Sequence, residues 1–319
     1  MGRWALLCVL ASAHAFAPVV PAPRRLRAAR AANEYGADEL LAAATQAAKQ
    51  AGALMVSASL AGRAVEKSKS NSKDLLTKTD LACQDTIVET LLSQCPGTRV
   101  LGEEDVAPGA AAAKQAADAA LSQPGQCWVV DPIDGTANFV DGIPLSSVSI
   151  SAVSAGPEPT VLVGVVYDPF RDELFCAVRG GGAWVLRGKV RTDLAVSHAD
   201  SLADSIIYAG APPGPAALAP SLRGISAVAP RARTMRMLGS AALMLAYVAA
   251  GRGAAYFECD LAAWDTSAGA LLITEAGGIV TDASGATYTP LTRQIVATNG
   301  KIHAELLVLL ASVGGAQLD

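Results

Sequence analysis

The chain has few of the residues on which several common enzyme sites depend. Histidine occurs only three times in 319 residues, at positions 14, 198 and 303, and all three lie outside the motifs described below. A histidine nucleophile or a histidine zinc site is therefore not indicated. The chain also lacks a phosphate-binding glycine loop, because Gly188-Lys189 is followed by Val190 and no suitably spaced glycine precedes it. No uninterrupted apolar stretch reaches the length of a membrane span, so we expect no transmembrane segment.

Cysteine is scarce and irregularly spaced. Cys8 lies near the N-terminus, and the remaining five cysteines, an odd number, show no Cys-x-x-Cys pair. A disulfide scaffold is therefore not expected, and a reducing compartment fits the sequence better. Buried, inert thiols are the favoured interpretation, with redox sensing as the alternative because Cys83, Cys127 and Cys259 lie near acidic motifs.

The first 33 residues differ in composition from the rest of the chain. Arg3 precedes an apolar stretch at 4–10, small residues follow, and a basic tract runs on from Phe16 with no acid before Glu34. This pattern resembles the signal plus transit presequence that directs proteins to algal plastids bounded by extra membranes, and an ordinary secretory signal is the alternative. We expect residues 1–33 to be a plastid presequence.

Charge is low and unevenly distributed. Only 17% of the residues are charged and 51% are hydrophobic, so the chain can bury a large core. Five of the 25 basic residues and none of the 29 acidic ones lie in the presequence, which leaves 20 basic residues against 29 acidic ones. A body with this balance is not expected to bind nucleic acid. It would also repel a phosphate monoester unless cations lie between them.

The most informative motif follows an apolar strand predicted at 126–130, and reads Asp-Pro-Ile-Asp-Gly-Thr at 131–136. Buried aspartates without a neutralising partner are unfavourable, and Mg²⁺ is usually held by one or two carboxylates with waters and phosphate oxygens. The carbonyl oxygen of Ile133 lies between the two side chains and offers a further ligand. The motif therefore predicts a metal site suited to a phosphate ester, and the alternative is a plain β-turn.

Two further acidic clusters lie at the ends of predicted elements. Glu103-Glu104 follows a short strand at 99–101, and Asp265 opens a predicted helix that stops at Gly277-Gly278, a C-cap signal. Each has a simpler explanation, because the glutamates can form a solvated loop and Asp265 can be an N-cap. Together with the 131–136 motif, they provide four or five carboxylates, which is enough for two or three cations.

These three motifs, in this order, resemble the inositol monophosphatase family. It belongs to the superfamily of Mg²⁺-dependent, lithium-sensitive phosphatases that includes fructose-bisphosphatase. The resemblance covers about residues 38–313 and implies an α/β (α+β) fold, the layered αβαβα sandwich, and usually a homodimer. We predict an N-terminal α+β half at 34–209, which carries the metal-binding motif, and a C-terminal α/β half at 210–319, which completes the site. A Pro/Ala-rich stretch at 210–220 is predicted to be a loop between the halves.

The metal ligands that the resemblance implies are Glu103, Asp131, Ile133, Asp134, Asp265 and Asp80. Glu103 and Asp131, with the Ile133 carbonyl, would hold one Mg²⁺. Asp131, Asp134 and Asp265 would hold the second. Asp80, at a predicted helix start, would serve a third and weaker site or act as an N-cap. In the family a Glu–Thr arrangement activates the attacking water, and here that catalytic role falls on Glu103 and Thr136. Lys69 matches a loop lysine near the metals, or is a surface lysine.

The substrate-binding residues implied in the same way are Glu103, Ile133, Asp134, Gly135, Thr136, Gly239, Ser240, Ala241, Glu258 and Asp265. Backbone N–H groups at 135 and 136 would face phosphate oxygens. The Gly-Ser-Ala at 239–241, where the family has Gly-Thr-Ala, would meet sugar hydroxyls. Glu258 would accept hydrogen bonds from a polyol, unless it is a surface glutamate. Ala137 departs from the family, which commonly has a second Thr there.

The sequence thus predicts a plastid Mg²⁺-dependent phosphatase that hydrolyses myo-inositol monophosphate. The nearest alternative is the same chemistry on L-galactose 1-phosphate or histidinol phosphate. A fructose-bisphosphatase or bisphosphate nucleotidase is less well supported, because the motifs resemble those of the monophosphatases most closely. A phospho-aspartate enzyme would need Asp-x-Asp, whereas two residues separate Asp131 from Asp134. A non-catalytic regulatory homologue is the alternative from another class.

Overall fold

Apolar segments between residues 99 and 193 form a seven-stranded sheet in a computed structural model that describes residues 34–61, 65–67 and 75–317. The predicted presequence and Lys69 lie outside the described residues. The strands follow the order β3 (Arg99–Gly102), β4 (Gly125–Asp134), β5 (Ser147–Ala155), β6 (Thr160–Asp168), β7 (Glu173–Val178), β8 (Gly182–Arg187) and β9 (Val190–Asp193). β3 and β4 are parallel, and each later pair is antiparallel. The antiparallel sheet predicted from the sequence after Gly125 is confirmed.

A second sheet has five short strands in the order β11 (Thr234–Arg236), β10 (Ile206–Ala209), β12 (Ala255–Glu258), β14 (Ile295–Thr298) and β13 (Ile279–Asp282). β10 runs parallel to β11 and β12, and β14 runs antiparallel to β12 and β13. Every residue of β12 and β14 is buried. Their first three residues are Ala, Tyr and Phe in β12 and Ile, Val and Ala in β14, as expected of strands buried on both faces of a sheet.

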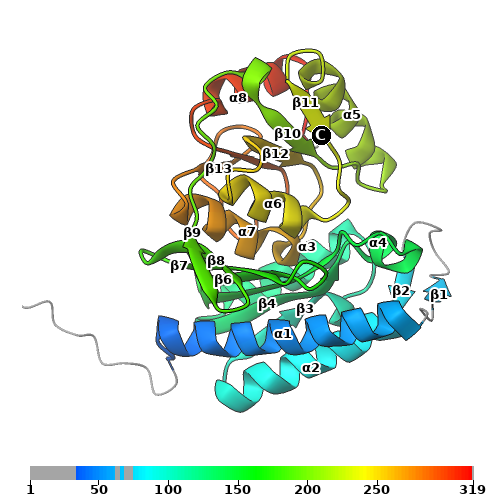
Figure 1. The fold of residues 1–319 in the computed structure, drawn as a ribbon, viewed down its shortest axis with the longest axis vertical. Helices are drawn as coiled ribbons and strands as arrows, with labels where there is room; N and C mark the ends of the chain where they lie inside the picture. Colours follow the sequence, from blue (N-terminus) through cyan, green and yellow to red (C-terminus); the bar gives the residue numbers. More distant parts are fainter. Residues whose placement is uncertain (1–33, 62–64, 68–74, 318–319) are drawn as a thin grey trace, which may run out of the picture. The chain divides into compact units, whose positions relative to one another are not determined.

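Helices cover both sheets and fill the space between them. α1 (Ala37–Ala61) and α2 (Lys78–Gln94) pack on the outer face of the large sheet, and α6 (Ala241–Ala249) and α7 (Ala263–Glu275) lie between the sheets. α5 (Pro215–Val228) and α8 (His303–Ser312) cover the other face of the small sheet (Figure 1). The layers therefore run α, β, α, β, α, and the fold predicted from the sequence is confirmed.

Shorter elements connect these layers. They are the hairpin of β1 (Val65–Lys67) and β2 (Leu75–Thr77), the 3₁₀ turns η1 (Glu103–Asp105) and η2 (Leu202–Asp204), and the helices α3 (Ala110–Ser122) and α4 (Thr136–Asp141). The loop predicted at 210–220 is partly wrong, because α5 begins at Pro215. Proline suits the first turn of a helix, where its missing N–H is not needed, and alanine and leucine then favour the helix.

The middle helix α7 is packed without spare room on either side. All of its residues from Ala263 to Ile273 are buried except Asp265, which is partly exposed. A Cβ added at Gly164 of β6 would lie 2.8 Å from the carbonyl oxygen of Ala268, and one added at Gly269 would lie 2.4 Å from Leu245 Cβ of α6. Glycine at these two positions therefore permits the close approach of α7 to the large sheet and to α6.

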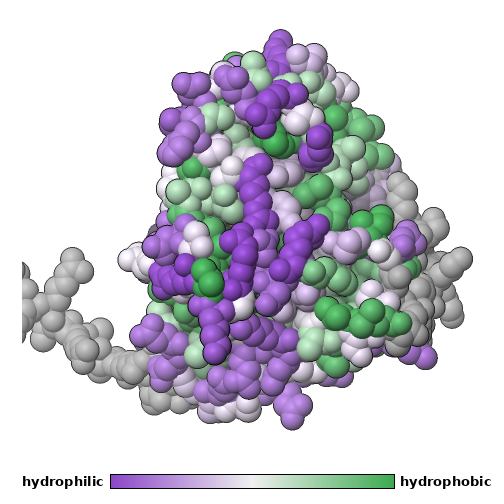
Figure 2. Space-filling view, viewed as in Figure 1, coloured by the Kyte–Doolittle hydropathy of each residue, from purple (hydrophilic) through white to green (hydrophobic). Residues whose placement is uncertain are grey.

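Exposed apolar side chains are spread over several elements. Leu60, Val308, Val190 and Met237 are exposed to 84%, 71%, 66% and 59%, and they belong to different parts of the chain. On the face shown in Figure 2, hydrophobic residues form separate patches between hydrophilic ones. The homodimer that the family resemblance implies therefore stays a prediction.

Among the described residues, none of the helices combines the length and apolar character that a membrane crossing requires.

Candidate metal centre

Three aspartates from two elements meet between the two sheets. Asp131 and Asp134 lie at the end of β4, and Asp265 lies in the first turn of α7. One carboxylate oxygen of each lies within 4.8 Å of the other two, which is close enough to share a cation. The first two are almost completely buried, with 2% and 7% of their surface exposed. The structure thus brings together the three residues that the sequence prediction assigned to one Mg²⁺.

Parallel pairing of β3 with β4 carries Glu103 to the same place. The pairing continues to Gly102 of β3 and Val130 of β4, so the residues that follow them, Glu103 and Asp131, lie at the same level. The two carboxyl groups lie close enough for each to shift the pKa of the other. Burial, and then the negative charge of Asp265 and other neighbouring carboxylates, raises the pKa of Glu103 well above its usual range; burial and Glu103 do the same to the pKa of Asp131.

The chain turns sharply after Asp131. The Ile133 N–H donates to Asp131 Oδ1 at 3.0 Å, and Thr136 Oγ1 donates to the Ile133 carbonyl at 3.1 Å. The β4–β5 register shifts between Asp131 and Asp134, and Gly135 has a φ of +90°. The segment therefore forms a turn, as the alternative interpretation required, and also contributes carboxylates to the cluster. Within the described ranges, Thr136 is directed to Ile133 and not to Glu103, so the Glu–Thr pairing stays a prediction.

Asp134 closes the N-terminus of α6. Its carboxylate accepts hydrogen bonds from Ser240 Oγ, from Ala242 N at 2.8 Å and from Ala241 N at 3.2 Å. Free N–H groups of a helix N-terminus favour such an anion. Burial nevertheless outweighs these bonds and raises the pKa of Asp134 to about 6. The segment that the sequence analysis assigned to sugar hydroxyls thus has Asp134 as its partner in the structure.

Asp265 is held in a related way at the start of α7. Its Oδ2 accepts from the N–H of Ala262 at 2.6 Å, and Ala262 is the N-cap, so the interpretation of Asp265 as the N-cap is wrong and its place is the first turn of the helix. Burial and the charge of Asp134 raise the pKa of Asp265 to about 7. This hydrogen bond and the position within the cluster are therefore compatible.

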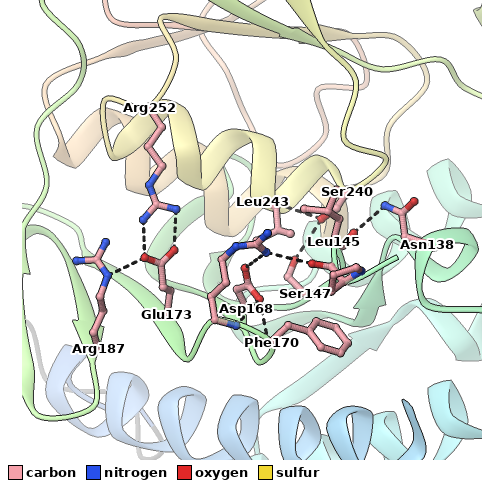
Figure 3. A network of polar contacts seen from close by, with 12 residues as sticks. Asn138, Leu145, Ser147, Asp168, Phe170, Glu173, Arg187, Ser240, Leu243 and Arg252 are labelled. Carbon is pink, nitrogen blue, oxygen red and sulfur yellow. Dashed lines mark hydrogen bonds and ion pairs between the residues drawn. The ribbon is translucent and has the colours of Figure 1, made fainter. Parts of the chain in front are cut away.

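Buried acids elsewhere in the same sheet have arginine partners. Glu173 accepts from Arg187 Nε at 2.7 Å and from both terminal nitrogens of Arg252 at 2.6 Å, and these arginines lower its pKa despite burial. Asp168 pairs with Arg171 at 2.9 Å. Figure 3 shows Glu173 between its two arginines. The carboxylates of the cluster face one another instead, which is the arrangement that a cation stabilises.

The donor set fits Mg²⁺. It consists of carboxylate oxygens and the Ile133 carbonyl, whose second lone pair is available beside the bond from Thr136. Such hard oxygen ligands suit Mg²⁺ or a similar divalent cation. A bound cation would relieve the repulsion that raises the pKa values of Glu103, Asp131 and Asp265.

Asp80 and Gln84 of α2 adjoin the glutamate turn. Asp80 is 1% exposed and its charge contributes to the raised pKa of Glu103. Gln84 Oε1 accepts from the Glu104 N–H at 3.0 Å, and a Cβ added at Gly102 would lie 2.4 Å from the same oxygen. Gln84 was not predicted from the sequence, although its spacing of four residues from Asp80 places both on one helix face.

Asn138 connects two segments next to the cluster, and it was also not predicted from the sequence. Its Nδ2 donates to the Leu145 carbonyl at 2.7 Å and to the Leu238 carbonyl at 2.6 Å, which ties α4 to the segment before α6 (Figure 3). Gly135 and Gly239 allow this contact, because a Cβ on Gly135 would lie 3.0 Å from the Gly239 carbonyl oxygen. In the sequence, the position of this polar residue three places after the turn glycine Gly135 could have indicated its role.

Glu258 borders the cluster at the end of β12. It is 8% exposed, so the surface interpretation is wrong, and its Oε2 accepts from Tyr256 Oη. Burial raises the pKa of Glu258 to about 8, and the charges of Asp265 and Asp134 add to this shift. The prediction placed Glu258 at the organic part of the substrate, and its position beside the aspartates is consistent with that role.

Comparison with known proteins gives a concordant picture. Residues 37–313 match the pattern of the Inositol monophosphatase family. The chain is 36% identical to "Nus factor SuhB" of Escherichia coli strain K12 over 84% of this chain and 94% of that protein. It is 35% identical to "Inositol monophosphatase 2" of Solanum lycopersicum over 83% and 95%. The solved structure of the Thermotoga maritima IMPase is similar with a TM-score of 0.71 and 31% identity, over 84% of this chain and 95% of that one.

Proposed function

Because the chain belongs to the inositol monophosphatase family, we propose that it is a Mg²⁺-dependent phosphomonoesterase that hydrolyses myo-inositol monophosphate to inositol and phosphate. The observation that carries this proposal is the meeting of Asp131, Asp134 and Asp265 within 4.8 Å, beside Glu103. A phosphatase site needs such a concentration of oxygen ligands, because the substrate and the protein are both negatively charged.

Each residue is assigned a role that its position allows. Mg²⁺, held by the cluster with the Ile133 carbonyl and more weakly near Asp80, would neutralise the phosphate oxygens and lower the pKa of the attacking water. The water oxygen bonds to phosphorus in line with the ester P–O bond, which breaks. Glu103, whose buried carboxyl has a raised pKa, accepts the water proton, and Thr136 orients the water when its hydroxyl turns from Ile133. The leaving alkoxide takes a proton from solvent.

The organic half of the substrate is assigned to the wall formed by Glu258 and the start of α6. Glu258 is the polar group that adjoins the aspartates from β12, and it suits an alcohol with several hydroxyls. The name of the tomato relative supports inositol monophosphate. L-galactose 1-phosphate and histidinol phosphate are the alternatives, because each also carries a hydrogen-bonding group on the alcohol that bears the phosphate.

A partner-binding role is the second candidate, since the E. coli relative is named a Nus factor. The complete set of carboxylates at the candidate site favours catalysis. The Asp131→Asn variant separates the two roles. An enzyme should lose several orders of magnitude in rate while staying folded, whereas a binding protein should keep its partner.

The direct test is phosphate release by the purified protein with Mg²⁺ and with EDTA. The substrates are inositol 1-phosphate, L-galactose 1-phosphate, histidinol phosphate and fructose 1,6-bisphosphate. We expect Mg²⁺-dependent turnover that is fastest with inositol 1-phosphate. Preference for another ester would replace the substrate while keeping the chemistry. Absence of release from all four would favour the partner-binding role.

We also propose that the protein acts in a plastid as a homodimer. The composition of residues 1–33 supports the plastid location, and the usual oligomeric state of the family supports the homodimer. A fluorescent protein fused behind residues 1–33 and expressed in an alga should enter the plastid, and secretion would refute this. Light scattering of the purified protein should give twice the monomer mass.

A further inference from the structure

A tyrosine and a glycine determine where the carboxyl group of Glu258 lies. Tyr256 and Glu258 are two residues apart on β12, so their side chains lie on the same face of the strand. The phenol of Tyr256 donates a hydrogen bond to Glu258 Oε2. Tyr256 is completely buried, and no part of it is available to a substrate. It therefore does not contact a substrate itself, and its hydrogen bond reaches the site at Glu258.

Gly210 forms the other side of this arrangement. It follows β10, the parallel neighbour of β12, and its N–H donates to the Phe257 carbonyl at 3.4 Å. A Cβ added at Gly210 would lie 1.5 Å from Glu258 Oε2 and 1.7 Å from its Cδ. The carboxyl group thus lies directly on the backbone of Gly210, in space that any other residue would fill. The phenol on one side and the bare backbone on the other leave the carboxyl one position.

This position is beside the candidate metal centre. Glu258 ends β12, and Asp265 lies seven residues later in the first turn of α7. The charges of Asp134 and Asp265 raise the pKa of Tyr256 and of Glu258, in agreement with this placement. Within the part of the chain that the structure describes, Oε2 is the oxygen that accepts from Tyr256, and Glu258 keeps 8% of its surface exposed. Oε1 is accordingly the oxygen available to a bound molecule.

We propose that Tyr256 and Gly210 are positioning residues that select the substrate class. They fix Oε1 of Glu258 at one distance from the metal centre, so the site favours a phosphate ester whose alcohol carries a second hydroxyl at the matching distance. It discriminates against a simple aryl phosphate that lacks this hydroxyl. The inference rests on the proposed function and deepens it.

The test compares inositol 1-phosphate with p-nitrophenyl phosphate in the full chain and its Tyr256→Phe variant. The variant removes one hydroxyl and keeps the ring, so circular dichroism and Tm should show a folded protein. We expect KM for inositol 1-phosphate to rise about tenfold with kcat within about twofold, the size of one hydrogen bond. Both constants for p-nitrophenyl phosphate should be unchanged.

Three further variants sharpen the comparison. Tyr208→Phe is the matched control on the same sheet, because that buried phenol donates to the carbonyl of Arg252 in the turn after α6, and the change should leave both substrates unaffected. Gly210→Ala should displace Glu258 and reproduce the selective rise in KM. In a double-mutant cycle with Glu258→Ala, adding Tyr256→Phe should cause no further rise in KM for inositol 1-phosphate, since the tyrosine acts through the glutamate.

Several outcomes would overturn the inference. They are equal changes for both esters in Tyr256→Phe, no change for either, full additivity with Glu258→Ala, or a wild-type protein with the same kcat/KM for both esters. Failure of the proposed function is distinct, because it would appear in the wild type as no Mg²⁺-dependent turnover of either ester.

Discussion

Asp134 accepts a hydrogen bond from Ser240, which lies 106 residues further along the chain. The bond joins the last residue of β4 to the N-cap of α6, and thus the end of the large sheet to a helix between the two sheets. The Ser240 hydroxyl also accepts from the Leu243 N–H at 3.3 Å. One hydroxyl therefore caps a helix and orients a predicted metal ligand.

Ser240→Ala should remove both functions of this hydroxyl. Loss of an N-cap costs about 1 kcal/mol of folding stability, and loss of a group that orients a ligand weakens metal affinity about 10-fold or more. We expect a lower Tm and a higher Mg²⁺ concentration for half-maximal phosphate release. Ser240→Thr, the residue that the family commonly has, should restore both. A normal Mg²⁺ requirement in Ser240→Ala would show that Asp134 does not need the hydroxyl.

Stability without metal should fall as the pH rises from about 4 to about 7. The pKa values of Asp134 and Asp265 are raised to about 6 and about 7 in the folded protein, against about 3.9 in an unfolded chain. Between these values the unfolded chain loses protons that the folded protein keeps, so the balance shifts toward unfolding. Below about pH 4 the two aspartates are protonated in both states and make no difference.

Mg²⁺ should reverse this trend, because it replaces the protons on the same carboxylates. The increase in Tm caused by Mg²⁺ should be small at pH 5 and larger at pH 8, as scanning calorimetry with EDTA or Mg²⁺ would measure. Asp118→Asn, at an exposed residue paired with Lys114, is the matched control and should keep the full effect. An increase that is independent of pH would argue against metal binding by the two aspartates.

Gln84→Ala should displace the glutamate turn. The Glu104 N–H would lose its acceptor, which costs about 1–3 kcal/mol when the group stays buried, and Glu103 would move with it. We expect kcat to fall at least about tenfold, because small displacements of catalytic groups are costly. Gln94→Ala is the control on the same helix: it breaks an exposed hydrogen bond from α2 to Gln46 of α1 and should leave kcat unchanged. If the two variants behaved alike, Gln84 would have no positioning role.

Asp80→Asn tests the predicted third metal site. Asp80 is buried next to Glu103, so the amide keeps the shape while it removes one negative charge. We expect the Mg²⁺ concentration for half-maximal activity to rise about tenfold, with kcat at saturating Mg²⁺ within about threefold of the wild type. A Mg²⁺ titration of initial rates measures both quantities. An unchanged titration would assign Asp80 to the packing of α2.

The local patterns that predicted most of the fold were runs of apolar residues interrupted by turns. β4, β12 and α7 follow from such runs, and the carboxylates at 131, 134 and 265 attract attention because acids are rarely found at the ends of buried strands and helices. α5 escaped prediction because Pro215 and Pro220 were interpreted as loop residues, although one starts the helix and the other lies inside it.

The supporting residues depend on contacts that no local pattern encodes. Gly210 and Glu258 are 48 positions apart, and what joins them is the parallel pairing of β10 with β12. Gln84 reaches the glutamate turn only because α2 packs beside β4 and η1. Thr136 is directed to Ile133 by the local turn. Residue types and the family resemblance together predicted the candidate ligands, whereas tertiary packing determines which residues hold them.

The tight packing of α7 also governs how its backbone meets solvent. With Gly164 against Ala268 on one side and Leu245 against Gly269 on the other, the helix has no room to shift without opening the core. Its central amide protons can therefore exchange with deuterium only when the two sheets separate, which makes their exchange a direct report of global unfolding. Asp265 lies in the first turn of this helix, so the tight packing that protects the central amides also fixes the position of its carboxylate.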